Sequence, residues 1–448
     1  MNLRDRFFKD SRPRKGDDRN PFQEDRDIVL YSSAFKRLLS ITQVAAGSAG
    51  TLLHTRLTHS LQVAQVGRRL AEKLHKTQPE LCERFGGVDP DAVETSCLAH
   101  DIGHPPFGHL AEEVLDELAK DFGGFEGNAQ SFRVLTHLGI RSRKFEGMNL
   151  TRGSLRSLLK YPWTYSDRPT DEFHPTGRKP KWGSYDCDKA MFDWVCETKT
   201  IGEHISRTPE AEIMDWADDV TYCVHDVEDF FRAGLIPLHL LKAYEGTARS
   251  KERERFFEFV LRNERKDRVL DSLGAAEIEN IFDDLLIYGT FQFEQPYEGS
   301  DEDHADLRVF TSRLINRFIN ALELKAPDEN DPKTAKRKTL EQCEVAILKQ
   351  LTWFYVIEAP GLAIQHQAQR KITRRLATIF LNEAGERYPS GILPLSCRDY
   401  LKRANLSNDD KHRRAIDLIG NMTESQAIDL YQRLEGITVT PGLDRILV

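Results

Sequence analysis

The sequence predicts an all-α protein, because helical periodicity recurs along most of the chain and strand-like alternation is scarce. The clearest apolar stripe runs at helical spacing from His59 through Val63, Val66 and Leu70 to Leu74. The final third of the chain returns to the same pattern. Together these observations predict a large helical core with further helices towards the C-terminus.

Capping and breaking signals bound the first predicted helices. Residues 1–23 are charged and carry two prolines, and helical pattern starts around Arg26. Asp89-Pro90 provides a cap followed by proline at the first helical position. That helix is expected to end near Gly103, because Pro105-Pro106 cannot continue it.

The later segments alternate between irregular and helical pattern. Residues 141–210 are rich in Gly, Pro, Trp and Tyr and are predicted to be irregular, whereas residues 211–232 predict a strong helix. Two polar runs, 299–306 and 327–338, are predicted to be exposed loops. The sequence Thr423-Glu424-Ser425-Gln426 predicts a capping box that opens one of the last helices.

Composition excludes several classes of protein. Of 448 residues, 40% are hydrophobic and 30% charged, and the net charge of −8 argues against extensive coating of nucleic acid. Apolar stretches fall far short of the ~20 residues of a membrane helix, and Met1–Asn20 lacks the apolar region of a secretory signal. Seven cysteines without a CxxC pair suit reduced thiols. We therefore expect a cytoplasmic protein with no membrane partner.

The dipeptide His100-Asp101 is the first candidate for chemistry. It ends a predicted helix whose preceding turn is apolar, and it offers a neutral imidazole and a carboxylate to one ion. Such donors suit divalent metals such as Mn, Fe, Zn or Mg. The alternative interpretation is a capping aspartate beside a core histidine.

Two further helices carry polar side chains on apolar faces. His59 lies on the inward stripe of its helix, and Asp218 lies in a helix otherwise lined by apolar residues. A buried carboxylate is costly unless it is paired with a cation or a metal. Asp218, Tyr222 and Asp226 also recur on one helical face. In the alternative interpretation, Asp218 and Asp219 both face solvent.

The string from His100 to His109, His-Asp-Ile-Gly-His-Pro-Pro-Phe-Gly-His, with Glu112 following, resembles the signature of the deoxynucleoside triphosphate triphosphohydrolases of the HD superfamily. This family includes bacterial dGTPases and the human SAM-and-HD-domain dNTPase. Further matching pieces follow in chain order: residues 31–38, 42–44, 56–60, 125–130, 217–222 and 422–424. The resemblance covers residues 25–235 firmly and the C-terminal third loosely.

The resemblance implies roles for particular residues. The metal ligands would be His59, His100, Asp101 and Asp218, with Asp218 preferred to Asp219 because the family's Asp-x-x-x-Tyr-x-x-x-Asp frame fits it. The catalytic residues would be His109, its acidic partner Glu112, and His104. The substrate-binding residues would be Gln43, Val44, Arg56, Tyr222 and Asp226. The implied cofactor is a divalent metal ion (Mn, Mg, Fe, Ni or Zn, with Mn or Mg favoured for activity). One departure is Gly127, where relatives with the human-type pattern carry a histidine.

The resemblance also implies an HD-domain helical fold with additional C-terminal helices. We expect a partly mobile N-terminal tail (1–24), an HD catalytic core (25–235) and a helical C-terminal region (236–448) packed on the core. That last region would contribute to oligomer or regulatory contacts. The implied partners are a dNTP substrate, further copies in a hexamer or tetramer, and a regulatory dNTP or single-stranded DNA.

The implied function is metal-dependent hydrolysis of dGTP or other dNTPs to deoxynucleoside and inorganic triphosphate. Two alternatives remain open at this point. The first is another HD phosphohydrolase, a 5′-nucleotidase or phosphodiesterase, which would share the metal ligands. The second is a nucleotide- or single-stranded-DNA-binding protein with vestigial activity. Base selectivity and the native metal are not determined by these motifs.

Overall fold

A computed structural model of the chain describes residues 2–9, 16–44, 54–169, 180–197, 205–242, 250–263, 268–327, 333–386, 391–403 and 405–438. The prediction of an all-α protein is confirmed: helices dominate these ranges, which also contain a small antiparallel sheet of β1 (Leu322–Leu324) and β2 (Ala335–Arg337). Across these ranges no helix is both long and apolar enough to span a bilayer.

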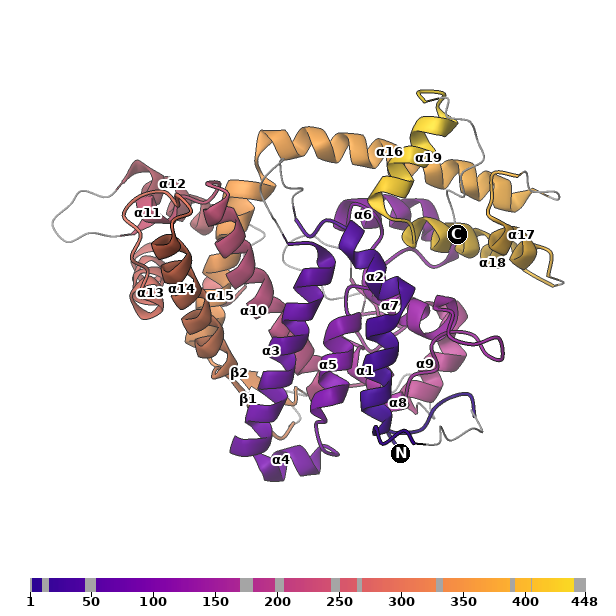
Figure 1. Cartoon of the computed structure of the whole chain (residues 1–448), viewed down its shortest axis with the longest axis horizontal. Coiled ribbons are helices and arrows are strands. Elements are labelled where there is room, and N and C mark those ends of the chain that lie inside the picture. Colours follow the sequence, from indigo (N-terminus) through magenta and orange to yellow (C-terminus); the bar gives the residue numbers. More distant parts are fainter. Residues whose placement is uncertain are drawn as a thin grey trace.

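The first half of the chain forms a helical bundle (Figure 1). Its elements are α1 (Pro21–Tyr31), α2 (Ser33–Arg37), η1 (Leu38–Ser40), α3 (Arg56–Thr77), α4 (Pro79–Arg84), α5 (Pro90–Ala99), α6 (His109–Ala119), η2 (Lys120–Phe122), α7 (Gly127–Arg133), η3 (Val134–Leu138), α8 (Arg152–Ser157), η4 (Asp186–Asp188), α9 (Lys189–Cys196) and α10 (Pro209–Arg232). Helix α3 packs against both α5 and α10, and α1 covers α5. The centre of the bundle is therefore made by helices that the sequence places far apart.

Helix α3 forms where the sequence predicts it. Thr55 closes a capping box at its start, and the predicted apolar stripe is buried along its length. At Gly67 a Cβ atom would lie 2.5 Å from the Sγ atom of Cys97 on α5. The glycine thus permits the close approach of α3 and α5, which brings His59 towards the end of α5.

Three sequence-based expectations are corrected by the structure. Helix α1 begins at Pro21 rather than around Arg26, because the side chain of Asn20 caps it in a capping box. The acidic run 299–306 is not a loop: Ser300 caps α14 (Asp301–Ile319), and acidic residues in a first turn favour the positive end of the helix dipole. Within the run 327–338, residues 335–337 form strand β2, and residues 328–332 lie outside the described ranges.

Other expectations about the elements are confirmed. Asp89 caps α5, and Thr423 and Gln426 form the capping box of the last described helix. In the stretch 141–210 the described residues, 141–169, 180–197 and 205–210, are largely irregular, although they include the short helices α8 and α9. At the N-terminus, Arg6 donates to the carboxylate of Asp25 at 2.6 Å, so this part of the N-terminal segment contacts the bundle.

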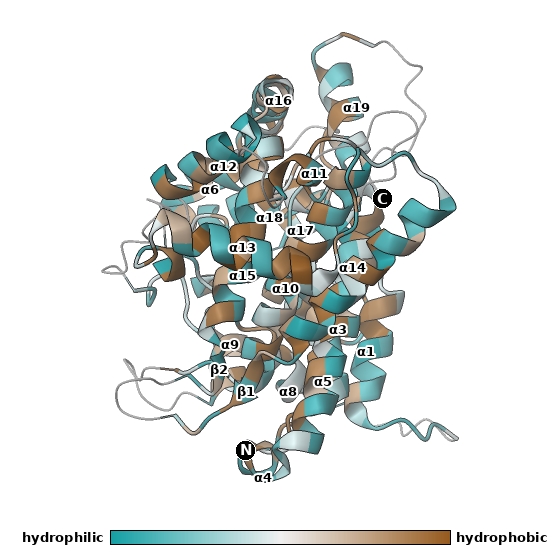
Figure 2. Cartoon of the chain, turned by 90° about the vertical axis from the view of Figure 1, so that its left-hand side faces the viewer, coloured by the Kyte–Doolittle hydropathy of each residue, from teal (hydrophilic) through white to brown (hydrophobic). Residues whose placement is uncertain are grey.

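The second half of the chain adds two groups of helices. Their elements are α11 (Leu238–Leu241), α12 (Lys251–Arg262), η5 (Arg268–Leu270), α13 (Ala275–Gly289), α14, α15 (Thr339–Thr352), η6 (Trp353–Ile357), α16 (Pro360–Gly385), α17 (Leu395–Leu401), α18 (Asn408–Gly420) and α19 (Glu424–Leu434). Helices α13 to α15 extend the main core beside α10 (Figure 2). Helices α16, α18 and α19 form a second apolar cluster with α6 (Figure 1). The helix that begins at His109 therefore lies between the bundle and the C-terminal helices.

Candidate functional site

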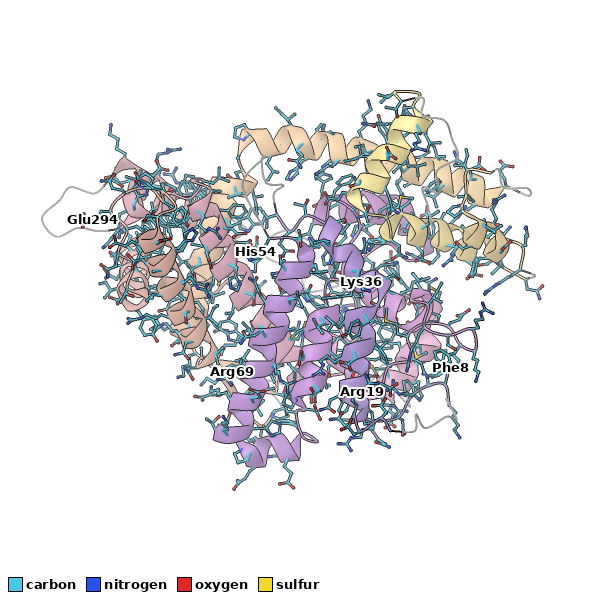
Figure 3. All side chains as sticks on the ribbon, in the orientation of Figure 1. Phe8, Arg19, Lys36, His54, Arg69 and Glu294 are labelled. Atoms are coloured by element: carbon cyan, nitrogen blue, oxygen red, sulfur yellow. The ribbon has the colours of Figure 1, made fainter. Side chains whose placement is uncertain are left out.

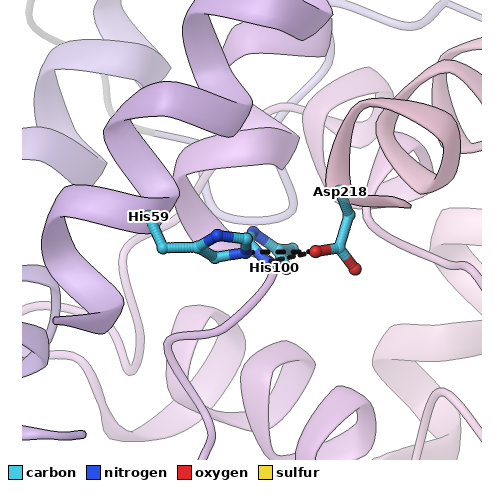
Figure 4. Close-up of side chains that lie close together, drawn as sticks. All are labelled: His59, His100 and Asp218. Carbon is cyan, nitrogen blue, oxygen red and sulfur yellow. Dashed lines mark hydrogen bonds and ion pairs between the residues drawn. The ribbon is translucent and has the colours of Figure 1, made fainter. Parts of the chain in front are cut away.

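Three side chains from separate helices converge at the centre of the bundle (Figure 4). His59 projects from α3, His100 follows the last turn of α5, and Asp218 projects from α10. The Nε2 atom of His59 lies 3.1 Å from Oδ1 of Asp218, and Nε2 of His100 lies 3.6 Å from the same oxygen. The candidate ligand atoms of all three lie within 4.8 Å of one another, the spacing expected of donors around one ion.

The orientation of His100 suits a metal ligand. Its Nδ1 atom donates to the carbonyl oxygen of Cys97 at 2.7 Å, which leaves Nε2 as the atom that faces the cluster. That Nε2 atom is buried and has no hydrogen-bond partner among the described residues. Buried polar atoms in proteins are almost always paired. A divalent ion would supply the missing partner, so these residues fit a metal.

Asp101 belongs to the same cluster but also contacts cations of the protein. Its Oδ1 atom lies 3.4 Å from Nε2 of His100 and 3.0 Å from Nδ1 of His104, and Oδ2 accepts from Nη1 of Arg56 at 2.7 Å. Burial raises the pKa of Asp101, but His100, Arg56 and His104 outweigh it and hold that pKa well below its usual range. Asp101 is therefore an anion that lies beside the candidate metal ligand His100 and also pairs with Arg56, the candidate phosphate contact.

The adjacent acids of α10 point to different partners. Asp218 faces His59, whereas Asp219 forms ion pairs with Lys349 at 2.6 Å and Arg337 at 3.2 Å. Burial raises the pKa of Asp218, but His100, His59 and a nearby lysine lower it overall, so the group is ionised. Asp218 is thus the α10 carboxylate that the fold presents to the histidines.

Lys160 is a member of the site that sequence reasoning missed. Its Nζ atom lies 2.5 Å from Asp215 and 3.8 Å from Asp218. Although burial lowers the pKa of Lys160, Asp215 and other nearby groups raise it overall, so Lys160 remains a cation. The residue follows α8 in a stretch with no helical periodicity, and no local pattern points to it.

A second polar cluster lies at the start of α6. Nδ1 of His109 lies 3.0 Å from Oε2 of Glu112, whose Oε1 accepts from the backbone N–H of Gly127 at 2.9 Å. Burial raises the pKa of Glu112, but Lys181 and His109 hold it well below its usual range. The side chain of His109 is 63% exposed, so its other ring nitrogen is open to a ligand from solvent.

His104 connects the two clusters. It contacts Asp101 on one side, and its ring centroid lies 5.2 Å from that of His109 on the other. Burial and the nearby Arg56 lower the pKa of His104 to about 4, so its ring is neutral at neutral pH. A Cβ atom at Gly127 would lie 3.2 Å from this ring. The imidazole of His104 therefore fills the space that a larger side chain at position 127 would need.

The residues predicted to bind substrate are distributed around these clusters. Asp226 is buried on α10, and burial together with the charges of Asp229 and Asp218 raises its pKa well above the usual range, which favours the protonated form. Tyr222 is half-buried one turn earlier on the same helix. The structure brings Arg56, Asp101 and His104 together, as described above.

The segment 42–44 lies beside the start of α3, where Thr42 forms an antiparallel bridge with Thr55. Gln43 is half-buried, and its Oε1 atom has no hydrogen-bond partner within the described part of the chain. Val44 packs against the main hydrophobic core. Across the site, His54 lies at the start of α3 and faces α10 (Figure 3), where its backbone N–H and Nδ1 both contact Asp229.

Comparison with known proteins finds two family models and several relatives that match this chain. The family model of the HD domain matches residues 56–161, and that of the phosphohydrolase-associated domain matches residues 337–433. A deoxyguanosinetriphosphate triphosphohydrolase-like protein of Streptomyces coelicolor is 36% identical over 444 residues, 95% of each chain. Proteins with the same name from Bifidobacterium longum (32% over 94% of this chain and 84% of that one) and Shewanella halifaxensis (30% over 94% and 93%) are also similar.

Proposed function

Because the chain belongs to the family of deoxyguanosinetriphosphate triphosphohydrolase-like proteins in the HD superfamily, we propose that it hydrolyses dGTP or other dNTPs to a deoxynucleoside and inorganic triphosphate. At the coarser level, the chain is an HD-family phosphohydrolase. The proposal rests chiefly on the buried, unpartnered Nε2 of His100, which lies between the carboxylates of Asp101 and Asp218 beside the His109–Glu112 pair.

His59, His100, Asp101 and Asp218 would hold one divalent ion, with Mn or Mg favoured and Fe, Ni or Zn also suited to the donors. When bound, such an ion polarises a phosphoryl oxygen and acidifies water. The carboxylates of Asp101 and Asp218 are already ionised at neutral pH, as ligands of a divalent ion must be. These two donors therefore need no further proton loss to bind an ion.

In the proposed reaction a water oxygen attacks the α-phosphorus and the bond from that phosphorus to O5′ breaks. One water proton has to leave the nucleophile, and O5′ has to gain one. His109 would handle this proton at its exposed Nε2, because Nδ1 is held by Glu112. The carboxylate of Glu112 would orient the ring and stabilise its protonated form. His104, neutral and next to His109, would contact the phosphates.

Cations and polar groups around the cluster would bind the rest of the nucleotide. Arg56 and Lys160 would offset the charge of the triphosphate through charge-assisted hydrogen bonds. In its protonated form Asp226 can donate to the sugar 3′-hydroxyl, and the unpartnered Oε1 of Gln43 can accept from it. Tyr222 would contact phosphate or sugar, and Val44 would support the position of Gln43.

Product analysis tests the proposal directly. The purified protein is incubated separately with dGTP, each other dNTP and GTP in Mn²⁺ or Mg²⁺, and products are separated by anion-exchange chromatography. We expect triphosphate plus deoxynucleoside. Release of orthophosphate or a monophosphate would instead identify another HD phosphohydrolase. Tight binding of single-stranded DNA without turnover in either metal, also with mixed dNTPs present, would support a binding function.

A further inference from the structure

Glu424, the first residue of α19, contacts two segments of the candidate site, one next to Gln43 and one just before His109. Its carboxylate accepts hydrogen bonds from Thr42, next to Gln43, and from Phe107, two residues before His109. We infer that Glu424 is a positioning residue, which holds the Gln43 segment and the turn into His109 in one arrangement. The inference rests on the proposed function for its kinetic consequence, but the contacts themselves can be tested without it.

The contact with Thr42 uses both carboxylate oxygens. The backbone N–H of Thr42 donates to Oε1 at 2.8 Å, and its hydroxyl donates to Oε2 at 2.9 Å. Thr42 also pairs with Thr55 in an antiparallel bridge, and the N–H of Arg56 donates to the carbonyl of Ile41 at 3.1 Å. Glu424 therefore anchors the segment that carries Gln43 to the start of the helix that carries Arg56 and His59.

The contact with Phe107 supports an unfavourable backbone conformation. Phe107 has a φ of 70°, in the left-handed region that is unfavourable for a non-glycine residue. Its N–H donates to Oε1 of Glu424 at 3.3 Å. Such a conformation persists when its surroundings hold it. Because helix α6 begins two residues later, this turn determines where His109 lies.

Arg37 forms further hydrogen bonds that join the segment before α19 to the turn before α6. One guanidinium nitrogen donates to the carbonyl of Met422 at 2.9 Å, and another donates to the carbonyls of Ile102 at 2.9 Å and His104 at 2.7 Å. The start of α19 and the residue before its cap are thus bound to the turn at residues 102–107 through two independent sets of contacts. A negative side chain at the first position of α19 is itself favoured by the helix dipole.

Hydrogen exchange tests the contacts independently of catalysis. In E424A we expect the amides of Thr42 and Phe107 to exchange roughly tenfold faster than in the wild type, because each loses its acceptor. E424Q should remain near the wild type, since its amide oxygen can accept from both N–H groups. The matched control is D429N, on the same helix, where the exposed carboxylate of Asp429 pairs with Arg433 at 3.2 Å. Unchanged exchange in E424A, with a circular dichroism spectrum like the wild type's, would overturn the inference.

Kinetics then separate a positioning role from a general loss of stability. In E424A we expect kcat/KM for dGTP to fall roughly tenfold, and the preference for dGTP over 2′,3′-dideoxyguanosine triphosphate to fall with it, because displaced Gln43 no longer reads the 3′-hydroxyl. E424Q should rescue both, and T42V, which removes only the hydroxyl contact, should add little to E424A. An equal loss for both nucleotides would contradict positioning of Gln43. A wild type that releases no triphosphate would refute the proposed function, while the exchange result would still decide whether Glu424 holds the two segments.

Discussion

Arg133 on α7 and Asp417 on α18 form a buried ion pair in which the guanidinium Nε donates to both carboxylate oxygens at 3.0 Å. The two side chains are 10% and 1% exposed. Arg133 also pairs with Asp188 at 2.5 Å, and Asp417 accepts from Gln130 at 3.2 Å. One guanidinium therefore joins the bundle to the C-terminal helices.

We expect D417A to lower the free energy of unfolding by about 3 kcal/mol, because it leaves the buried cation of Arg133 with one counter-ion fewer. Urea denaturation followed by circular dichroism measures this change. The double variant R133M/D417A should not recover the loss, since it leaves the buried carboxylate of Asp188 without its arginine partner. D399A, which removes an exposed ion pair with Lys402, is the control and should change stability by less than about 0.5 kcal/mol. A D417A variant as stable as this control would contradict the importance of the pair.

The two adjacent acids of α10 should differ in their effect on metal binding. We expect D218N to weaken Mn²⁺ binding roughly 100-fold and to abolish turnover, because it removes an anionic donor from the cluster. D219N should keep metal affinity near the wild type, since Asp219 pairs with Lys349 and Arg337 instead. Isothermal titration calorimetry with chelator-stripped protein measures both. If D219N lost the metal and D218N kept it, the assignment of the ligand would be reversed.

Loss of the carboxylate beside His109 should reduce the chemical step. In E112Q we expect kcat to fall roughly 10²-fold with a smaller change in KM, because the neutral amide no longer stabilises a protonated imidazole. E113Q is the matched control: the neighbouring Glu113 is exposed and pairs with Arg370 at 2.7 Å. Steady-state kinetics on dGTP give both constants. A kcat for E112Q within twofold of the E113Q value would show that the pair does not take part in proton transfer.

Glu126 should make stability depend on pH. Burial, opposed by Lys181, raises the pKa of Glu126 from its ordinary value of 4.5 to about 7. Its protonated form is therefore favoured by folding, so its stabilising contribution is full below pH 4.5 and is lost as the pH rises through 7. Between pH 5.5 and 8 the wild type should lose about 2 kcal/mol relative to E126Q, which does not titrate. Parallel denaturation curves at the two pH values measure this difference, and an identical pH dependence of the two proteins would exclude Glu126 as its source.

Local pattern was sufficient for much of the fold. The stripe on α3, the Asp89 cap of α5 and the Thr423 capping box each depend on residues within a few turns of one another. A period of 3.6 residues and a cap report which face is buried and where a helix starts. The same logic failed at 299–306, where an acidic run was interpreted as a loop although acidic side chains also stabilise a first helical turn.

The sequence by itself determined the helical class, the main helices and the family motifs from which the candidate site was inferred. Only the tertiary structure decided which polar groups meet: Arg56 with Asp101, Lys160 beside the cluster, and Glu424 with Thr42, 382 residues away. Periodicity specifies a buried face to within a turn, but a hydrogen bond requires placement to a few tenths of an ångström. That placement comes from the packing of whole helices, which no local stretch of sequence encodes.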